Sequence, residues 1–207
     1  MIGCIIQARM GSTRLPGKVM MKLDEKNTVL DNVINQLSFC KLIDKKIIAT
    51  TNLKQDDVIE KQSKNLGIEY FRGESLDVLD RYYQCAKKFG IGHIVRITSD
   101  CPLIDPEIVD RVIKKYLTEE YDYVSNTLVR TFPIGTDIEI FSFSLLEKSW
   151  KNASLNSDRE HVTSYIRNKK ISCKLGNLEN KEKLDHLRLT LDKIDDLKLI
   201  RKIIEKI

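Results

Sequence analysis

Segments rich in isoleucine and valine alternate along the chain with segments of helical periodicity, and this alternation constrains the fold more than any other feature. Each apolar segment precedes or follows an amphipathic stretch, the order expected when helices connect the strands of one sheet. The sequence therefore predicts an α/β fold. The first four strands are expected over Ile2–Gln7, Lys46–Thr51, Ile68–Phe71 and His93–Thr98.

Local capping signals predict where the helices of this fold begin. Thr28 and Asp31 have the spacing of a capping pair, so the first helix is expected to begin near residue 28. Asp105 is a favoured N-cap and Pro106 suits a first helical position, which predicts the start of another helix. Further helices are expected over Gln55–Asn65, Leu76–Phe89 and Ile194–Ile207.

The pattern changes beyond Tyr121 and returns to alternation near the end of the chain, where Leu187–Leu191 predicts a strand. We expect a single domain over residues 1–207, with a region at about 121–170 inserted so that it covers or extends the main sheet. The elements expected in this region are strands over Tyr121–Asn126 and Ile138–Phe143 and short helices near Ser144–Lys151 and Asp158–Arg167.

Composition narrows the classes of partner. The net charge of +5 is too modest to indicate a nucleic-acid binder, and aromatic and basic residues do not interleave as they do in RNA-binding sheets. Apolar stretches such as Ile2–Ile6 are far shorter than the roughly 18 residues that span a bilayer. Five widely spaced cysteines predict reduced thiols and no zinc site. We expect a cytoplasmic protein without a nucleic-acid or membrane partner.

Positive charge gathers in the loop that directly follows the first strand. Residues 1–23 contain four cations and no acid. Ligands of open α/β sheets bind at the carboxyl ends of strands, and Gly11 lets the backbone approach a ligand there. We therefore predict that this loop binds a nucleoside triphosphate, the alternative being a solvated basic surface loop. The side chains offered are the cations Arg9, Arg14 and Lys18 and the hydroxyls of Ser12 and Thr13.

The loop differs from the Walker A motif of P-loop proteins. Gly11 and Gly17 enclose five residues where that motif has four, and Val19 stands where a hydroxyl would bind magnesium. A helix is not expected before residue 28. The sequence therefore excludes a P-loop nucleotide site.

Two acidic residues at predicted strand ends are candidate magnesium ligands. Asp100 follows the strand His93–Thr98 and has no helix to cap, because Asp105 serves the next helix. Magnesium usually takes one or two carboxylates together with phosphate oxygens. Asp192 ends the predicted strand Leu187–Leu191 and is the candidate second ligand. The alternatives are a turn role for Asp100 and an N-cap role for Asp192.

Five motifs together resemble a known family. The loop Ala8–Lys18 resembles the triphosphate loop of sugar nucleotidyltransferases that activate acidic sugars, such as the 3-deoxy-manno-octulosonate and acylneuraminate cytidylyltransferases. Within this group the motifs most resemble those of the spore-coat-polysaccharide (SpsF-type) branch. The likeness continues in order through Arg72–Tyr82, Arg96–Asp105, Asp158–Thr163 and Leu187–Asp192.

This resemblance implies a Rossmann-like three-layer α/β/α nucleotidyltransferase fold, of GT-A-like type, with a mixed sheet and a small dimerisation insertion. It also implies a homodimeric, magnesium-dependent enzyme that transfers CMP from CTP to an acidic sugar or related acceptor for surface glycan synthesis, releasing pyrophosphate. The family pattern continues with Thr and Pro after its last acid, whereas Lys193 and Ile194 follow Asp192 here.

The resemblance also assigns roles by position. Arg9, Lys18 and Asp100 would be catalytic, and Asp100 and Asp192 would hold Mg²⁺. The acceptor would face Asp137, Glu139, Arg159, Glu160 and His161, although His161 is equally read as an ordinary, partly exposed helical histidine. The nucleotide would contact Ala8, Arg9, Gly11, Ser12, Arg14 and Lys18 through the loop and Arg72 and Ser75 near the base.

Two alternative functions remain open at this stage. One keeps the fold but uses another nucleotide such as GTP with a sugar phosphate, because the loop recognises phosphates and not the base. The other is a non-catalytic module that binds a nucleotide or sugar nucleotide. That module is favoured if Asp100 and Asp192 do not converge on one point.

Overall fold

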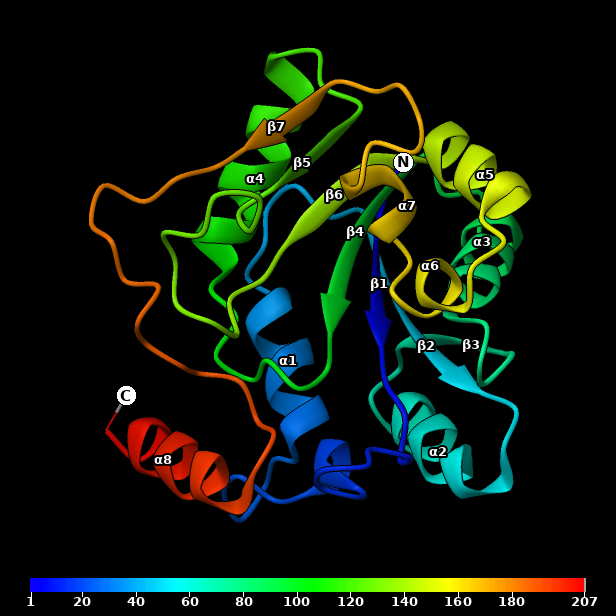
Figure 1. The fold of residues 1–207 in the computed structure, drawn as a ribbon. Helices are drawn as coiled ribbons and strands as arrows, with labels where there is room; N and C mark the ends of the chain where they lie inside the picture. Colours follow the sequence, from blue (N-terminus) through cyan, green and yellow to red (C-terminus); the bar gives the residue numbers. More distant parts are fainter. Residues whose placement is uncertain (207) are drawn as a thin grey trace.

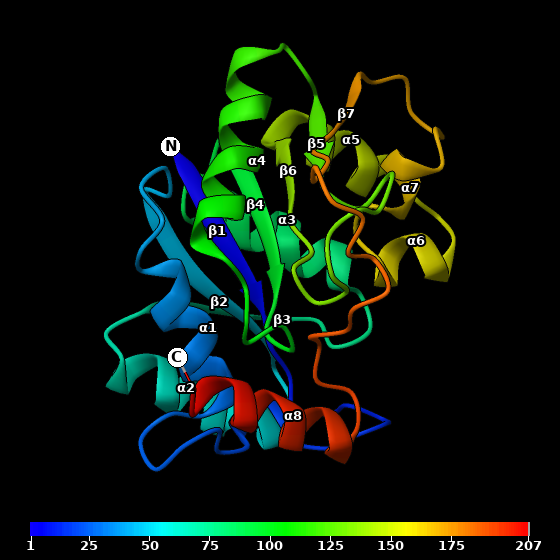
Figure 2. The ribbon, with the colours of Figure 1, turned by 90° about the vertical axis from the view of Figure 1, so that its left-hand side faces the viewer.

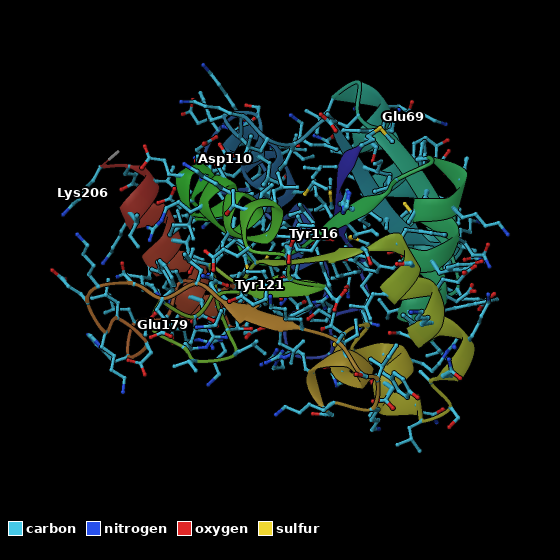
Figure 3. All side chains as sticks on the ribbon, turned by 90° about the horizontal axis from the view of Figure 1, so that it is seen from above. Glu69, Asp110, Tyr116, Tyr121, Glu179 and Lys206 are labelled. Carbon is cyan, nitrogen blue, oxygen red and sulfur yellow. The ribbon has the colours of Figure 1, made fainter. Side chains whose placement is uncertain are left out.

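The computed structural model describes residues 1–206, which form one mixed sheet of seven strands in the order β3-β2-β1-β4-β6-β5-β7. Strands β1 to β4 run parallel, whereas β6 runs antiparallel to both β4 and β5. Glu69 on the edge strand β3 and Glu179 just beyond the edge strand β7 mark the two sides of the molecule in Figure 3. The strands are β1 (Ile2–Gln7), β2 (Lys45–Thr51), β3 (Glu69–Gly73), β4 (His93–Thr98), β5 (Tyr123–Ser125), β6 (Glu139–Ser142) and β7 (Leu175–Asn177).

Helices cover both faces of the sheet and make three layers (Figures 1 and 2). On one face α1 (Val29–Leu37), α2 (Asp57–Asn65) and α4 (Pro106–Thr118) pack on the strands. The other face carries α3 (Val78–Lys88), α5 (Phe143–Asn152) and α7 (Ser164–Arg167), with α6 (Asn156–Glu160) against α3. Helix α8 (Ile194–Ile204) closes a third apolar cluster beside the start of α1. The α/β class, the three layers and the mixed sheet are confirmed.

The predicted capping residues occupy the positions expected of them. The Thr28 hydroxyl accepts the backbone N–H of Asp31, and the Asp31 carboxylate accepts the N–H of Thr28. Asp105 accepts the backbone N–H groups of Glu107 and Ile108 at the start of α4, with Pro106 in the first helical turn. These caps satisfy amide groups that a helix start leaves without partners. Short-range hydrogen bonding therefore explains why these two starts were predictable.

The prediction of a strand over Leu187–Leu191 is wrong. Only Arg188 makes a bridge, to Ile134, and the rest of this segment is irregular backbone. The edge strand is β7 instead, which pairs with β5 in parallel register. Alternating leucines suggested the period of a strand, but Leu187 is 42% exposed and Leu191 is fully buried against α8.

The predicted start of the third helix is also corrected. Helix α3 begins at Val78, because the Asp77 carboxylate accepts the backbone N–H of Asp80. Leu76 therefore lies before the helix and is 86% exposed.

The region at about 121–170 extends the sheet and also covers one of its faces. Its strands β5 and β6 add to β4, and its helices α5 and α7 lie over the cluster that includes Tyr123 and Phe141. Its part in dimerisation stays a prediction. Among the helices of residues 1–206, none has the length and apolar character needed to cross a membrane.

Candidate functional site

The carboxyl ends of β1 and β4 lie side by side, because Gln7 pairs with Thr98 in parallel register. The loop after β1 and the turn after β4 therefore meet at one edge of the sheet and enclose a cavity of about 170 Å³. Ligands of open α/β sheets bind at such an edge. The cavity is lined by Gln7, Arg9, Ser12, Thr13, Arg14, Lys18, Val19, Thr98, Ser99 and Asp100.

Lys18 joins the two predicted magnesium ligands at this cavity. Its ammonium group donates to Asp100 Oδ2 at 2.8 Å, to Asp192 Oδ1 at 3.0 Å and to the carbonyl oxygen of Leu191 at 2.7 Å. Lys18 and Asp192 are buried, whereas the Asp100 side chain keeps 27% of its surface exposed. Residues 18, 100 and 192, far apart in sequence, thus converge on one point.

Asp192 is the most heavily bonded acid of this group. Besides Lys18, its carboxylate accepts from Arg14 at 2.7 Å and from Arg188 at 2.5 Å. Burial raises the pKa of Asp192, but the hydrogen bonds from Arg188 and Lys18 outweigh it and hold that pKa below its ordinary value. Its side chain does not cap α8, since Asp196 accepts the N–H groups at that helix start. The N-cap alternative for Asp192 is therefore wrong.

The carboxylate of Asp56 holds the loop after β1 in place. This role of Asp56 was not predicted from the sequence. Asp56 is fully buried, and its carboxylate accepts the backbone N–H of Met10 at 2.7 Å and the hydroxyl of Thr51. Asp56 stands at the N-cap of α2 but makes no capping bond there. The carboxylate thus orders the loop instead of its own helix. The contact joins residues 46 positions apart, so no local pattern could have shown it.

The local backbone geometry of the loop explains why several of its positions are occupied by small residues. The backbone N–H groups of Ser12 and Gly17 both donate to the carbonyl oxygen of Met10, which folds the loop on itself. Gly17 has a φ of 71°, a conformation that favours glycine. At Gly11 a Cβ atom would lie 3.1 Å from Nε2 of Gln55. Ala8 is buried and continues the pairing of β1 with β2.

A second cavity of about 360 Å³ adjoins the first through Arg9. Two predicted acceptor residues of α6, Arg159 and Glu160, line it. The Arg159 guanidinium donates to Asp77 Oδ2 at 2.9 and 2.5 Å and to the carbonyl oxygens of Trp150 and Ala153, so it is held rigidly. Asp77 in turn caps α3. The contacts tie this cavity wall to the core helix behind it.

A third, smaller cavity of about 80 Å³ adjoins the first through Thr98 and includes the predicted residues Asp137 and Glu139. Asp137 pairs with Arg130 through two bonds of 2.7 and 2.8 Å. The wall also contains Arg96, Thr127 and Arg167, which sequence reasoning did not assign.

Glu139 is buried and accepts three hydrogen bonds. Its partners are the Arg96 guanidinium at 2.5 Å, the Tyr123 hydroxyl at 2.5 Å and the Thr163 hydroxyl at 2.7 Å. Burial raises the pKa of Glu139, but Arg96 and the two hydroxyls lower it below its ordinary value. Burial, together with the charge of Glu139, raises the pKa of the Tyr123 hydroxyl. Glu139 is therefore an ionised carboxylate in the described fold.

Six predicted residues are absent from the linings of these adjoining cavities. Ala8 and Gly11 belong to the loop after β1, and Asp192 is reached through Lys18. The other three are Arg72, Ser75 and His161. Arg72 pairs with Asp57 at 2.6 Å and Glu60 at 2.8 Å and lines a separate surface cavity beside α2. Ser75 is half-buried in the loop before α3. His161 is exposed and directly follows the end of α6.

The carboxylates of Asp100 and Asp192 suit magnesium when a triphosphate supplies further oxygens. Both reach the same nitrogen of Lys18, so their oxygens face a common point. Magnesium takes one or two carboxylates with phosphate oxygens and water in nucleotide sites. Within residues 1–206 there is no cluster of three or more His, Cys, Asp or Glu side chains that could hold a metal by itself. The donor set therefore fits a metal shared with a nucleotide.

Comparison with known proteins places these features in a wider group. A family model described as cytidylyltransferase matches residues 3–206. The chain is 34% identical over 209 residues to the spore coat polysaccharide biosynthesis protein SpsF of Bacillus subtilis, covering 98% of this chain and 85% of that protein. It is 42% identical over 197 residues to an uncharacterized protein of Methanocaldococcus jannaschii, covering 94% of this chain and 79% of that protein.

Solved structures of similar fold include two proteins described as a cytidylyltransferase and a synthetase. A cytidylyltransferase from Leptospira borgpetersenii superposes with a TM-score of 0.95 at 37% identity, covering 100% of this chain and 87% of that one. A CMP:2-keto-3-deoxy-manno-octonic acid synthetase complexed with CTP shares the fold with a TM-score of 0.74 at 12% identity, covering 99% and 98% of the two chains.

Proposed function

The chain belongs to the cytidylyltransferase family, and we propose that it transfers CMP from CTP to an acidic sugar or related acceptor and releases pyrophosphate. The observation that carries this proposal is the convergence of Lys18, Asp100 and Asp192 beside the cation-rich loop. A non-catalytic module would not need two carboxylates directed at one point. Cations that can bind phosphate oxygens and carboxylates that can bind a metal lie together at the carboxyl ends of the strands, which suits a metal-bound triphosphate.

The loop residues would bind the triphosphate. Arg9, Arg14 and Lys18 line the cavity and can neutralise phosphate oxygens, and the Ser12 hydroxyl can donate to them. Asp56 keeps the loop in place through the N–H of Met10. Preorganised donors of this kind are typically worth about 10²–10³ in turnover each.

Asp100 and Asp192 would hold Mg²⁺, which when bound supplies positive charge to the phosphate oxygens. In the reaction the oxygen of an acceptor hydroxyl forms a bond to the α-phosphorus of CTP and releases its proton to solvent, while the bond from that phosphorus to the bridging oxygen of pyrophosphate breaks. The negative charge moves to pyrophosphate, where Arg9, Arg14 and Lys18 can stabilise it. These side chains need only position groups and neutralise charge.

The acceptor would occupy the cavities beside Arg9 and Thr98. In the smaller one Arg96 is already paired with Glu139, whereas Arg167 forms no ion pair within residues 1–206, so Arg167 is the cation that would attract an anionic acceptor there. Arg159 and Glu160 in the larger one offer a donor and an acceptor to sugar hydroxyl groups. These charges support an acidic sugar as the acceptor class.

We further propose that the product serves surface polysaccharide synthesis in the cytoplasm and that the enzyme is a homodimer. The support for the first is the 34% identity to SpsF, whose name refers to spore coat polysaccharide biosynthesis. The homodimer, with the region at about 121–170 as its contact, rests on the family resemblance and is tested by the mass of the protein in solution.

A pyrophosphate-release screen tests the proposed reaction. The four nucleoside triphosphates are each combined with Mg²⁺ and with a panel of acidic sugars and sugar phosphates, and Asp100→Asn serves as the matched control. We expect release with CTP and an acidic sugar, and a loss of about 10² or more in the control. Pyrophosphate release only with GTP and a sugar phosphate would show that these, and not CTP and an acidic sugar, are the substrates. No release with any pair would contradict the enzyme assignment.

A further inference from the structure

Lys18 occupies the position between the two acids that a metal ion would need. All three N–H groups of its ammonium are used, on Asp100, Asp192 and the carbonyl oxygen of Leu191. The Lys18 side chain is only 8% exposed. In the nucleotide-free protein these two carboxylates therefore already share a cation, and Asp192 is also paired with Arg14 and Arg188 from its outer side.

A divalent ion cannot join this arrangement without moving Lys18. Magnesium lies about 2.0–2.1 Å from its oxygen ligands. An ion at that distance from both carboxylates would approach the ammonium nitrogen, which itself lies 2.8 and 3.0 Å from them. The like charges would repel each other at short range. Metal binding therefore requires Lys18 to break its bonds to both acids.

Free metal gives the displaced ammonium nothing to bind, whereas a triphosphate does. Breaking these two bonds leaves Lys18 as a buried charge with only the carbonyl oxygen of Leu191 as its partner, which is costly. Phosphate oxygens can accept the hydrogen bonds that the carboxylates lose. Arg9 lines the same cavity, and within residues 1–206 it forms no ion pair, so it can receive the phosphates before Lys18 moves.

We propose that Lys18 excludes free divalent ions from Asp100 and Asp192, so that the site takes a metal–triphosphate complex and not the metal alone. When the complex binds, Lys18 exchanges its two carboxylate partners for phosphate oxygens, and Asp100 and Asp192 would then be free to hold the metal. This inference rests on the proposed function for the identity of the ligand. Its first half, the exclusion of free metal, can be tested without any nucleotide.

The test measures Mn²⁺ binding by the electron paramagnetic resonance of free Mn²⁺, without nucleotide, at neutral pH. The variants are Lys18→Met and, as a matched control, Arg9→Met, which removes one positive charge from the same cavity but leaves the bonds of Lys18 intact. We expect one Mn²⁺ per chain in Lys18→Met, bound at least about tenfold more tightly than in the wild type or the control. Adding Asp192→Asn to Lys18→Met should abolish the gain.

Three results would overturn the exclusion of free metal. One is wild-type protein that binds Mn²⁺ as tightly as Lys18→Met, and another is Lys18→Met without a site. The third is an equal gain in Arg9→Met, since that would reflect only the lost charge. The wild-type measurement holds even if a variant fails to fold, which circular dichroism would reveal.

A second measurement uses wild-type protein with a non-hydrolysable CTP analogue. We expect the analogue and Mn²⁺ each to raise the affinity for the other by at least about tenfold. If the analogue binds equally well with and without Mn²⁺, the exchange is wrong and the nucleotide site stands. If the analogue does not bind under either condition, the proposed function fails, whatever the result with metal alone.

Discussion

Two clusters, each made of paired positive and negative side chains, lie at the same end of the sheet. They differ in the backbone elements that carry their residues. In the lysine cluster, made of Lys18, Asp100 and Asp192, each residue lies outside the regular strands of the sheet. In the glutamate cluster, Arg96 and Glu139 stand opposite each other on paired strands, and Tyr123 reaches them from the next strand.

The difference teaches which contacts can change. The Asp100 side chain is 27% exposed toward a cavity, whereas that of Glu139 is 5% exposed and accepts three hydrogen bonds. Residues outside the strands can exchange partners when a ligand supplies new ones, but residues fixed in strands cannot move without breaking the sheet. We therefore expect damage to the glutamate cluster to appear as lost stability and damage to the lysine cluster as lost activity.

The largest expected effect is on stability, from Glu139→Ala. This change leaves Arg96, whose side chain is only 18% exposed, beside two hydroxyls without its carboxylate, and breaking a buried pair costs up to roughly 3–5 kcal/mol. Urea unfolding measures the loss. Glu69→Ala is the control, because that side chain is 57% exposed, and it should change stability by less than about 0.5 kcal/mol. Equal stability of the two variants would contradict the assigned role of the glutamate cluster.

The lysine cluster should show the opposite behaviour in Asp100→Asn. Turnover is expected to fall by about 10² or more, because the variant keeps the shape but loses the charge of a metal ligand. The melting temperature should change little. Asp192→Asn should have a similar defect, and the double variant should lose less than the product of the two single effects. Wild-type turnover in Asp100→Asn at limiting Mg²⁺ would remove this acid from the mechanism.

Asp56 sharpens the comparison, because it is a buried acid that supports the loop of the lysine cluster. Asp56→Ala leaves the N–H of Met10 without its acceptor, and an unsatisfied buried donor costs about 1–3 kcal/mol. We expect a lower melting temperature together with weaker CTP binding, whereas Asp56→Asn, which keeps an acceptor oxygen, should recover part of both. A drop in stability with unchanged CTP affinity would show that Asp56 supports only the fold.

The smallest expected effect is the dependence of stability on pH through Asp192. The pKa of Asp192 lies below its ordinary value in the folded protein, so the unfolded chain binds its proton more readily. This contribution is fully present above about pH 4, the ordinary range of an aspartate, and is lost as the pH falls through the lower folded value. Thermal unfolding between pH 7 and 3 should show a shallower acid decline in Asp192→Asn. An identical profile would contradict it.

The sequence alone allowed much of the sheet and the central site to be predicted, because their signals are local. Strand β1 has a run of apolar residues and strand β4 has isoleucine or valine on both sides of Arg96. The caps at Thr28 and Asp105 rest on residues within three positions of each other. The loop after β1 could be assigned to a cavity because strand ends meet at one edge.

The features that were missed depend on contacts between distant residues. Strand β7 has three residues, including a glycine, and is defined only by its pairing with β5. The contact of Asp56 with Met10 carries no motif. The ion pairs of Arg72 with Asp57 and Glu60 arise because the fold brings β3 beside α2, and the expected place of Arg72 near the base stays a prediction.

The most direct test of the central claim, that the loop after β1 binds the triphosphate, is a calorimetric titration with CTP and Mg²⁺. Arg14→Ala and Lys18→Ala are compared with Lys64→Ala, which removes an exposed lysine from α2. We expect each loop variant to weaken binding by at least about tenfold, or 1.4 kcal/mol, and Lys64→Ala to bind like the wild type. Unchanged CTP affinity in both loop variants would contradict the claim.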